Sequence, residues 1–150
     1  MTLKHRLTSF GNRIGVWLFR ASDGRLSGSR KNPVLLITTP GRRTGIPRST
    51  CVRFLDTADG YVVWGTAGGA AQDPDWFCNL RAATVADLQI GPERLQAYPH
   101  ELVGVARDRV WTDLVLVRAP GVAKYTRRTA RTIPVAVLRP ISAGGPPEPP

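Results

Sequence analysis

The chain has 150 residues, a length that favours one domain, and its hydrophobic share of 42% is enough for a core. Its formal net charge is +10, and nearly all of its 21 basic residues are arginines. This charge favours an acidic partner, namely nucleic acid, anionic lipid or a polyanionic ligand, because arginine makes paired contacts with phosphate and carboxylate groups. A GC-rich genome, which encodes arginine often, would give the same excess.

The composition also argues against several classes of protein. Cys51 and Cys78 are the only cysteines and lack metal-type spacing, and His5 and His100 are too few for a metal cluster. No apolar stretch approaches the roughly 20 residues that span a bilayer, and the N-terminus lacks the apolar core of a signal peptide. We therefore expect a cytoplasmic protein without a metal.

The N-terminal segment, residues 1–24, has the pattern of an amphipathic helix over residues 3–20. Its apolar residues recur at helical spacing and alternate with arginines. The apolar stripe consists of Leu3, Leu7, Phe10, Ile14 and Trp17, and the arginines are Arg6, Arg13 and Arg20. We expect the stripe to pack on the rest of the protein. The alternative is peripheral contact of residues 1–20 with an anionic membrane, since basic and apolar faces coexist.

The following segment, residues 25–140, is predicted to be rich in short strands. Strands are expected at residues 33–39, 49–55, 61–64, 88–90, 95–101 and 133–138. The first of them is a continuous apolar, β-branched run, which predicts burial on both faces of a sheet. Asp59-Gly60 is a strong hairpin signal between the second and third strands.

Two helices are predicted between the strands. Asp73-Pro74 looks like an N-cap followed by proline at the first helical position, so a helix is expected to run through Trp76, Phe77 and Leu80. A second helix is expected over residues 105–117. The stripe of this helix that should face the core consists of Ala106, Val110, Leu114 and Val117.

About six strands that group by hairpins indicate an antiparallel barrel with peripheral helices, in the mainly β (α+β) class. Regular βαβ alternation, a Gly-x-Gly-x-x-Gly fingerprint and a Walker loop are all absent from the sequence, which argues against a Rossmann fold. The tail, residues 141–150, is rich in glycine and proline and is expected to be disordered.

Two segments carry the residues best suited to bind a ligand. Residues 38–48 (TTPGRRTGIPR) follow a buried strand and combine glycines, adjacent arginines and a hydroxyl, as in an anion-binding turn. Residues 68–81 (GGAAQDPDWFCNLR) combine a glycine pair with a helix start that offers free N–H groups and flat aromatic surface. The alternatives are a solvated basic hairpin and a capped helix whose aromatic residues fill the core.

With a third segment, residues 125–138 (YTRRTARTIPVAVL), these motifs resemble the deazaflavin-dependent nitroreductase family of actinobacteria in order and spacing. The resemblance covers about residues 25–139. It implies a six-stranded, FMN-binding-like split β-barrel whose cofactor is coenzyme F420, a deazaflavin with a phosphate and an acidic oligoglutamate tail. It also implies an enzyme that transfers hydride from the reduced deazaflavin to an electrophilic small molecule such as a quinone or nitro compound.

The resemblance implies cofactor contacts in three places. Those near the phosphate are Arg42, Arg43, Thr44 and Arg48. Those beside the ring are Thr66, Ala67, Gly68 and Gly69. Those at the helix start are Asp75, Trp76, Phe77, Cys78 and Asn79. For catalysis we choose Tyr125 as the donor to the acceptor's oxygen, either as an orienting hydrogen bond or as a proton source. The alternative is a core tyrosine at the barrel rim.

The chain departs from the family pattern at four positions. Pro40 stands where threonine is frequent, and Ala67 where lysine or asparagine is common. Ala119 and Val122 occupy positions of tyrosine type, so that only Tyr125 of that set matches. These departures leave cofactor binding intact and bring nitroimidazole activation into question.

Three other functions stay open on the sequence. The chain could bind or carry F420 without reducing anything, given its reduced tyrosine set. It could bind flavin (FMN) or haem on the same barrel, with FMN less favoured than F420, because a fold alone does not define its ligand. Nucleic-acid binding is motivated by the charge alone, and since no nucleic-acid motif is present we expect no such partner. The oligomeric state does not follow from the sequence.

Overall fold

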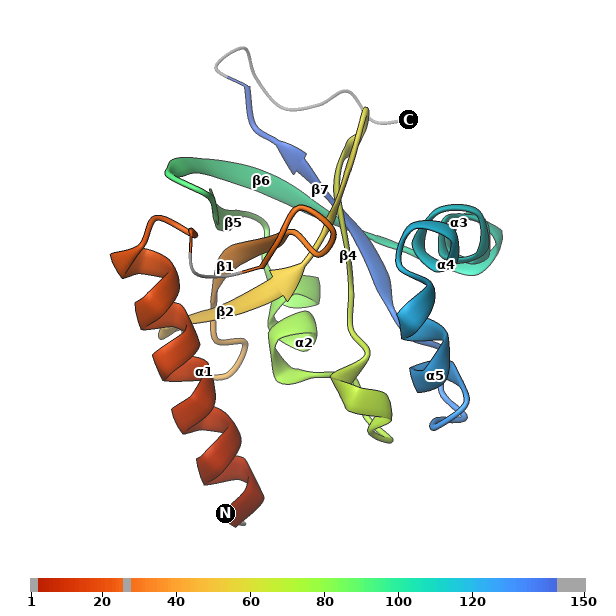
Figure 1. The fold of residues 1–150 in the computed structure, drawn as a ribbon, viewed down its shortest axis with the longest axis horizontal. Coiled ribbons are helices and arrows are strands. Elements are labelled where there is room, and N and C mark those ends of the chain that lie inside the picture. The colour runs from red at the N-terminus through yellow and green to blue at the C-terminus, as the bar shows by residue number, and fades with distance from the viewer. Residues whose placement is uncertain (1–2, 26–27, 143–150) are drawn as a thin grey trace.

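The computed structural model describes residues 3–25 and 28–142, with side chains described from residue 12 onward. Seven strands form one antiparallel sheet in the order β2-β1-β5-β6-β7-β4-β3. The strands are β1 (Val34–Pro40), β2 (Pro47–Arg53), β3 (Leu55–Thr57), β4 (Gly60–Trp64), β5 (Ala86–Ile90), β6 (Glu93–Leu102) and β7 (Val135–Pro140). The sheet curls into a half-barrel, which confirms the predicted antiparallel class with seven strands in place of six (Figure 1).

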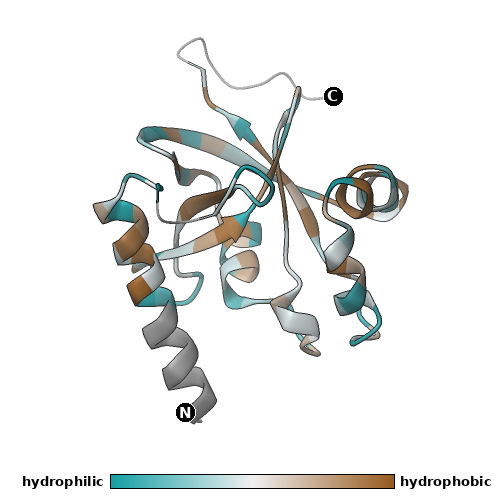
Figure 2. Ribbon diagram, in the orientation of Figure 1, coloured by the Kyte–Doolittle hydropathy of each residue, from teal (hydrophilic) through white to brown (hydrophobic). Residues whose placement is uncertain are grey.

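The inner face of the sheet closes around the largest apolar cluster. Leu35 and Ile37 of β1 point into it, and Phe77 and Leu80 of α2 (Asp75–Ala82) cover it. Leu36, between the two inward residues of β1, packs on the opposite face. The prediction that this strand is buried on both faces is therefore confirmed, and Figure 2 shows β1 as strongly hydrophobic.

The predicted strand over residues 49–55 is interrupted at Phe54. Residues before it pair with β1, whereas Leu55 and its successors pair with β4. The Phe54 N–H donates to the Pro33 carbonyl (3.2 Å), outside both ladders. The chain changes its partner strand here, and the sheet curls at this point as a result. The hairpin predicted at Asp59-Gly60 is confirmed by the Thr57–Gly60 pairing.

The start of α2 differs from the prediction. Its N-cap residue is Pro74, and no side chain caps the helix. Asp73 was expected to be the cap, and this prediction is wrong because both of its carboxylate oxygens bind arginines instead. Oδ1 accepts from Arg131 Nη1 and Oδ2 from Arg81 Nη2, each at 2.9 Å.

The helix predicted over residues 105–117 contains a π-helical turn. The segments are α3 (Gly104–Val110), the π-helical η2 (Trp111–Val115) and α4 (Leu116–Arg118). Because the wider turn rotates the apolar face, Trp111 and Val115 are buried while Ala106 and Val117 are exposed. The predicted stripe is thus wrong at its two ends.

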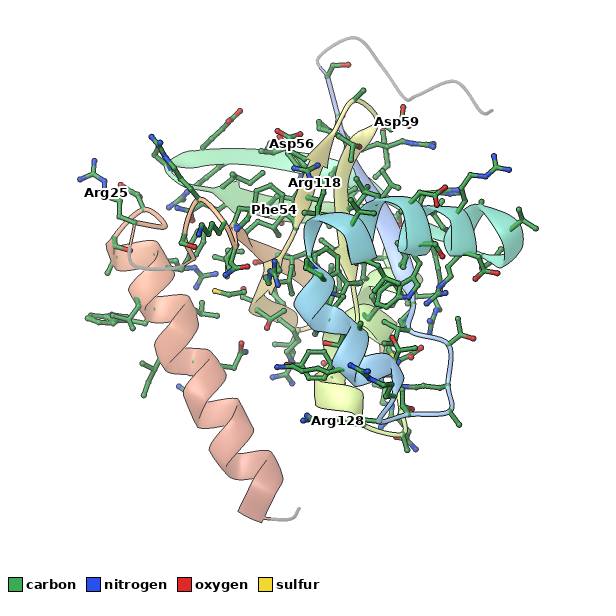
Figure 3. All side chains as sticks on the ribbon, turned by 45° about the vertical axis from the view of Figure 1, so that its right-hand side comes forward. Arg25, Phe54, Asp56, Asp59, Arg118 and Arg128 are labelled. Atoms are coloured by element: carbon green, nitrogen blue, oxygen red, sulfur yellow. The ribbon has the colours of Figure 1, made fainter. Side chains whose placement is uncertain are left out.

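The outer face of the sheet is covered on two sides. Helices α3 and α4, together with η3 (Pro120–Val122) and α5 (Ala123–Thr126), lie over β4 and β7 and enclose the second apolar cluster. In Figure 1, α1 (Leu3–Ala21) lies on the opposite side of the molecule from these helices. Figure 3 shows Arg118 of α4 beside Asp56 of β3, and Arg118 Nη1 donates to the Asp56 carbonyl (3.1 Å).

The predicted N-terminal helix is confirmed, but a different face of it packs on the sheet. Val16 and Phe19 pack on Leu36, whereas Ile14 and Trp17 are 45% and 65% exposed. The expectation that the stripe with Ile14 and Trp17 faces the protein is therefore wrong at these two residues. The side chains of the stripe's first three residues, and the predicted tail from residue 143, lie outside the described part.

Candidate functional site

The Gly-Arg-Arg segment forms a tight turn between β1 and β2. Gly41 donates to the Ile46 carbonyl and Gly45 donates to the Gly41 carbonyl, both at 2.8 Å. The Thr44 hydroxyl accepts from the Ile46 N–H at 3.2 Å. The turn is therefore closed by its own backbone, and its arginine side chains are not needed to hold its shape.

Arg42 joins this turn to the first turns of α2. Its backbone N–H and its Nη1 both donate to Asn79 Oδ1, at 3.1 and 2.9 Å. Its Nη2 pairs with Asp75 Oδ1 at 3.1 Å. Three of the predicted site residues, Arg42, Asp75 and Asn79, are thus brought together. Arg42 connects the Gly-Arg-Arg turn to α2, which is far from the turn in sequence.

Arg43 and Arg48 differ from Arg42 in having no polar partner within the described residues. Both side chains are exposed, and the same holds for the neighbouring Thr44. The described contacts do not join Arg43 or Arg48 to the other predicted site residues. Two unpaired guanidinium groups, of Arg43 in the turn and Arg48 at the start of β2, are suited to bind phosphate or carboxylate groups, so the donor set fits an acidic cofactor.

The segment that follows β4 is held by an arginine outside the predicted set. Arg131 Nε donates to the Ala70 carbonyl at 2.8 Å, and its Nη2 donates to the carbonyls of Gly65 and Thr66 at 3.2 and 2.8 Å. Its Nη1 pairs with Asp73 at 2.9 Å. Arg131 lies within the third motif segment, and its position in an Arg-rich motif was the one signal that could have singled it out.

Asp73 extends this arrangement to the end of α2. Its second oxygen binds Arg81, which also makes a two-point contact with Glu101 of β6, at 2.6 and 2.8 Å. These hydrogen bonds, the one to Glu101 most of all, raise the pKa of Arg81 above its ordinary value. These contacts hold the segment before α2 to the last turn of that helix, and the helix to β6.

The glycine pair lies against the end of α5. Both glycines of this turn (η1, Ala67–Gly69) have positive φ, and a Cβ on Gly69 would stand 2.6 Å from Arg128 Cβ. A Cβ on Gly68 would meet nothing within 4 Å, so the backbone faces open space there. Figure 3 shows Arg128 at this end of the molecule. Only glycine permits so close an approach at residue 69.

Tyr125 lies on α5, one turn before Arg128. Its ring is half-buried against the second apolar cluster, with Arg128 Cζ 5.6 Å and Lys124 Nζ 5.0 Å from the ring centroid. The same cluster contains Ala119 and Val122, which are buried in it. The two positions of tyrosine type therefore serve the core in this chain.

The residues predicted at the helix start have different environments. Phe77 is 0% exposed and packs in the core, edge-on to the half-buried Trp76 at 5.3 Å. Cys78 is half-buried, with Sγ 4.0 Å from the Asp73 carbonyl. Thr66 is half-buried and Ala67 exposed, with φ of 47° at Ala67. Trp76 is the aromatic side chain of this group that a ligand can reach without disrupting the core.

Comparison with known proteins connects this geometry to one family. The sequence profile of the F420H(2)-dependent quinone reductase family matches residues 11–140. F420H(2)-dependent quinone reductases of Mycobacterium tuberculosis, from strains H37Rv and CDC 1551, are 32% identical over 126 residues, which covers 81% of this chain and 84% of theirs.

Solved structures show the same fold. A chain described as a domain-swapped dimer is 26% identical with a TM-score of 0.66, and covers 92% of this chain and 100% of its own length. An F420-H2 dependent reductase (FDR-A) is 29% identical with a TM-score of 0.63, covering 71% of this chain and 94% of its own. The fold is the FMN-binding-like split β-barrel. The chain belongs to the F420H2-dependent quinone reductase family, and it is therefore an oxidoreductase whose cofactor is coenzyme F420.

Proposed function

We propose that this chain reduces a quinone with hydride from reduced F420, bound between the Gly-Arg-Arg turn, the start of α2 and the glycine pair. The observation that carries the proposal is the contrast between Arg42 and the two other arginines of the hairpin formed by β1, the Gly-Arg-Arg turn and β2. Arg42 is committed to α2, while Arg43 and Arg48 have no polar partner among the described residues. This leaves two cations free for an acidic ligand.

Each segment has a distinct role in this proposal. Arg43, Arg48 and Thr44 bind the phosphate and the acidic tail, and Arg42 holds the turn against Asp75 and Asn79. When bound, the cofactor supplies the hydride. The glycine pair, whose backbone is open at Gly68, and Trp76 would hold the deazaflavin ring. The remaining predicted contacts are Thr66, Ala67 and Cys78, whereas Phe77 supports Trp76 from the core.

Tyr125 is proposed as the hydrogen-bond donor to the acceptor. Negative charge develops on a quinone oxygen as hydride arrives, so a donor at that oxygen lowers the barrier. The ring is half-buried against the second apolar cluster and close to Arg128, the residue that approaches Gly69, which is compatible with this role. The Tyr125→Phe variant should keep its affinity for F420 and lose activity by about tenfold or more, the low end for a lost acid–base or oxyanion donor.

The test has two stages. Titration of oxidised F420, followed by its fluorescence, should show binding that competing FMN and haem do not displace. Addition of menadione to reduced F420 and the protein should then oxidise the deazaflavin. Binding without turnover of menadione or of nitro compounds would favour the carrier alternative, and preferential binding of FMN or haem would overturn the cofactor assignment.

We also propose that the exposed face of α1 contacts anionic lipid. Trp17 and Ile14 are exposed on this helix, beside the exposed Arg13 and Arg20. Among the described residues, no helix combines the length and apolar content that a bilayer crossing requires. A basic helix with an exposed tryptophan suits the lipid–water interface instead.

Vesicle flotation distinguishes this second proposal from its alternatives. The protein should bind phosphatidylcholine vesicles only when phosphatidylglycerol is present, and Trp17→Ser should reduce binding. Val105→Ser is the control, because Val105 is also an exposed apolar residue (75%) but lies on α3. Equal binding of both variants, or none by the unchanged protein, would contradict the proposal.

A further inference from the structure

Arg53, the last residue of β2, has an unusual environment for a half-buried arginine. Its Nε is the buried side-chain nitrogen or oxygen atom that lacks a hydrogen-bond partner in the described part of the chain. Its guanidinium makes no ion pair there, and its one recorded contact is the Trp64 ring, 5.8 Å from Cζ to the centroid. Because Nη1 and Nη2 have no partner either and are not buried, both can be reached from solvent.

Two other half-buried arginines, Arg131 and Arg107, each donate to backbone carbonyls and pair with an aspartate. The side chain of Arg139 also lacks a polar partner among the described residues, but a buried, unpaired Nε is found there at Arg53 alone. Buried polar groups are normally satisfied, because an unpaired donor loses its hydrogen bonds with water and gains nothing in return. The buried Nε of Arg53 therefore stays unpaired at a cost to folding, while Nη1 and Nη2 stay open to solvent.

The position of Arg53 places these donors on the outer face of the sheet, at the end of β2 away from the Gly-Arg-Arg turn and beside the end of β4. Trp64, under Arg53, ends β4 and directly precedes Gly65, which Arg131 holds. Trp64 also belongs to the apolar cluster against which Tyr125 packs. In Figure 1 the end of β2 lies beside β4, on the side of β4 away from α5. Arg53 of β2 and Tyr125 of α5 thus both contact the second apolar cluster, Arg53 through Trp64.

We propose that Arg53 binds the carbonyl oxygen of a quinone-type acceptor, an inference that rests on the proposed function. In the reaction, the quinone takes up two electrons and a proton as hydride and a second proton from water, giving the hydroquinone, while the reduced deazaflavin becomes oxidised. The negative charge that appears on the oxygen between these two events pairs with the guanidinium. The Trp64 ring below Arg53 keeps the guanidinium oriented.

The experiment compares Arg53→Met and Arg53→Lys with Arg94→Met, an exposed arginine of β6 that makes no contact with the site. Arg53→Met should lower kcat/KM for menadione about tenfold or more, with the affinity for F420 unchanged within twofold. Arg53→Lys should recover part of the loss, and the control should behave as the unchanged protein. In protein without cofactor, quenching of tryptophan fluorescence by menadione should weaken in Arg53→Met.

A purely structural role predicts a different result. Since Nε has no partner to lose, Arg53→Met should unfold at the same or a higher temperature than the unchanged protein. A fall in melting temperature together with activity, or kcat/KM and quenching within twofold of the unchanged protein, would overturn the assignment. If the unchanged protein fails to bind F420, or binds F420 without turning over menadione, the proposed function fails. If it turns over menadione and Arg53→Met does so equally well, only the Arg53 inference fails.

Discussion

At the scale of single residues, Arg131 does the most to shape the candidate site. One guanidinium binds three carbonyls of the segment after β4 and one oxygen of Asp73, and its side chain is only 13% exposed. These carbonyls, which follow the end of β4, share a single donor. The backbone conformation beside the glycine pair therefore depends on this distant arginine as well as on the local glycines.

Replacing Arg131 should be costly. We expect Arg131→Met to lower the free energy of unfolding by about 3 kcal/mol, because Asp73 loses a partner in a largely buried pair and the carbonyls lose their donor. Chemical denaturation measures the loss. Arg127→Met, in the same segment but exposed, should change stability by less than about 0.5 kcal/mol. Equal effects at both positions would contradict the role given to Arg131.

Cys51 provides a second prediction for a single residue. Its thiol lies under α1, with Sγ 3.8 Å from the Gly15 carbonyl, and burial raises its pKa while Arg20 opposes the change. A raised pKa means less thiolate at about pH 8, so iodoacetamide should alkylate Cys51 more slowly than a free cysteine. Phe19→Ala should open the contact and speed the alkylation several-fold, whereas Val105→Ala should not. Mass spectrometry of the modified peptide reports each rate.

At the scale of secondary-structure elements, α2 and the Gly-Arg-Arg turn behave as one unit. The helix has no side-chain cap of its own, and the Arg42 contacts with Asn79 and Asp75 attach it to β1 and β2. The two acceptors differ in burial, because Asn79 is buried and the Asp75 side chain is 70% exposed. Their contributions should differ accordingly.

The comparison of two variants tests this unit. Asn79→Ala should cost about 2 kcal/mol of unfolding free energy, since it removes the acceptor of two donors at a buried position. Asp75→Asn should cost less than about 0.5 kcal/mol, because solvent screens an exposed pair. Both values come from chemical denaturation, and F420 affinity should follow the same order. A larger effect of Asp75→Asn would show that the ion pair, and not Asn79, fixes the turn.

At the scale of the whole molecule, part of the net charge of +10 can be assigned to the proposed cofactor site. Many arginines are used within the fold, where they bind carbonyls and carboxylates. Arg43 and Arg48 remain available at the proposed cofactor site. A field of this sign attracts an acidic ligand at low salt and loses its effect as salt screens it.

Binding of F420 should therefore weaken strongly with salt. Between about 0.05 M and about 0.5 M salt, we expect the Kd to rise at least tenfold in fluorescence titrations. The double variant Arg43→Gln/Arg48→Gln should show a weaker salt dependence and a higher Kd at low salt. Arg94→Gln/Arg109→Gln removes the same charge from β6 and α3 and should leave the salt dependence nearly unchanged. Equal effects of the two pairs would place the attraction in the net charge alone.

The sequence by itself determined most of the strands, the hairpin at Asp59-Gly60, the terminal helix and the family, because these follow from local periodicity, turn chemistry and ordered motifs. Tertiary structure alone decided which face of α1 packs, since two apolar faces compete and only contact with Leu36 selects Val16 and Phe19. It also decided that Asp73 binds arginines 8 and 58 residues away instead of capping α2. Such partners are set by the closure of the sheet, which no local pattern records. For the same reason the free donors of Arg53 and the carbonyl contacts of Arg131 became visible only in the folded chain.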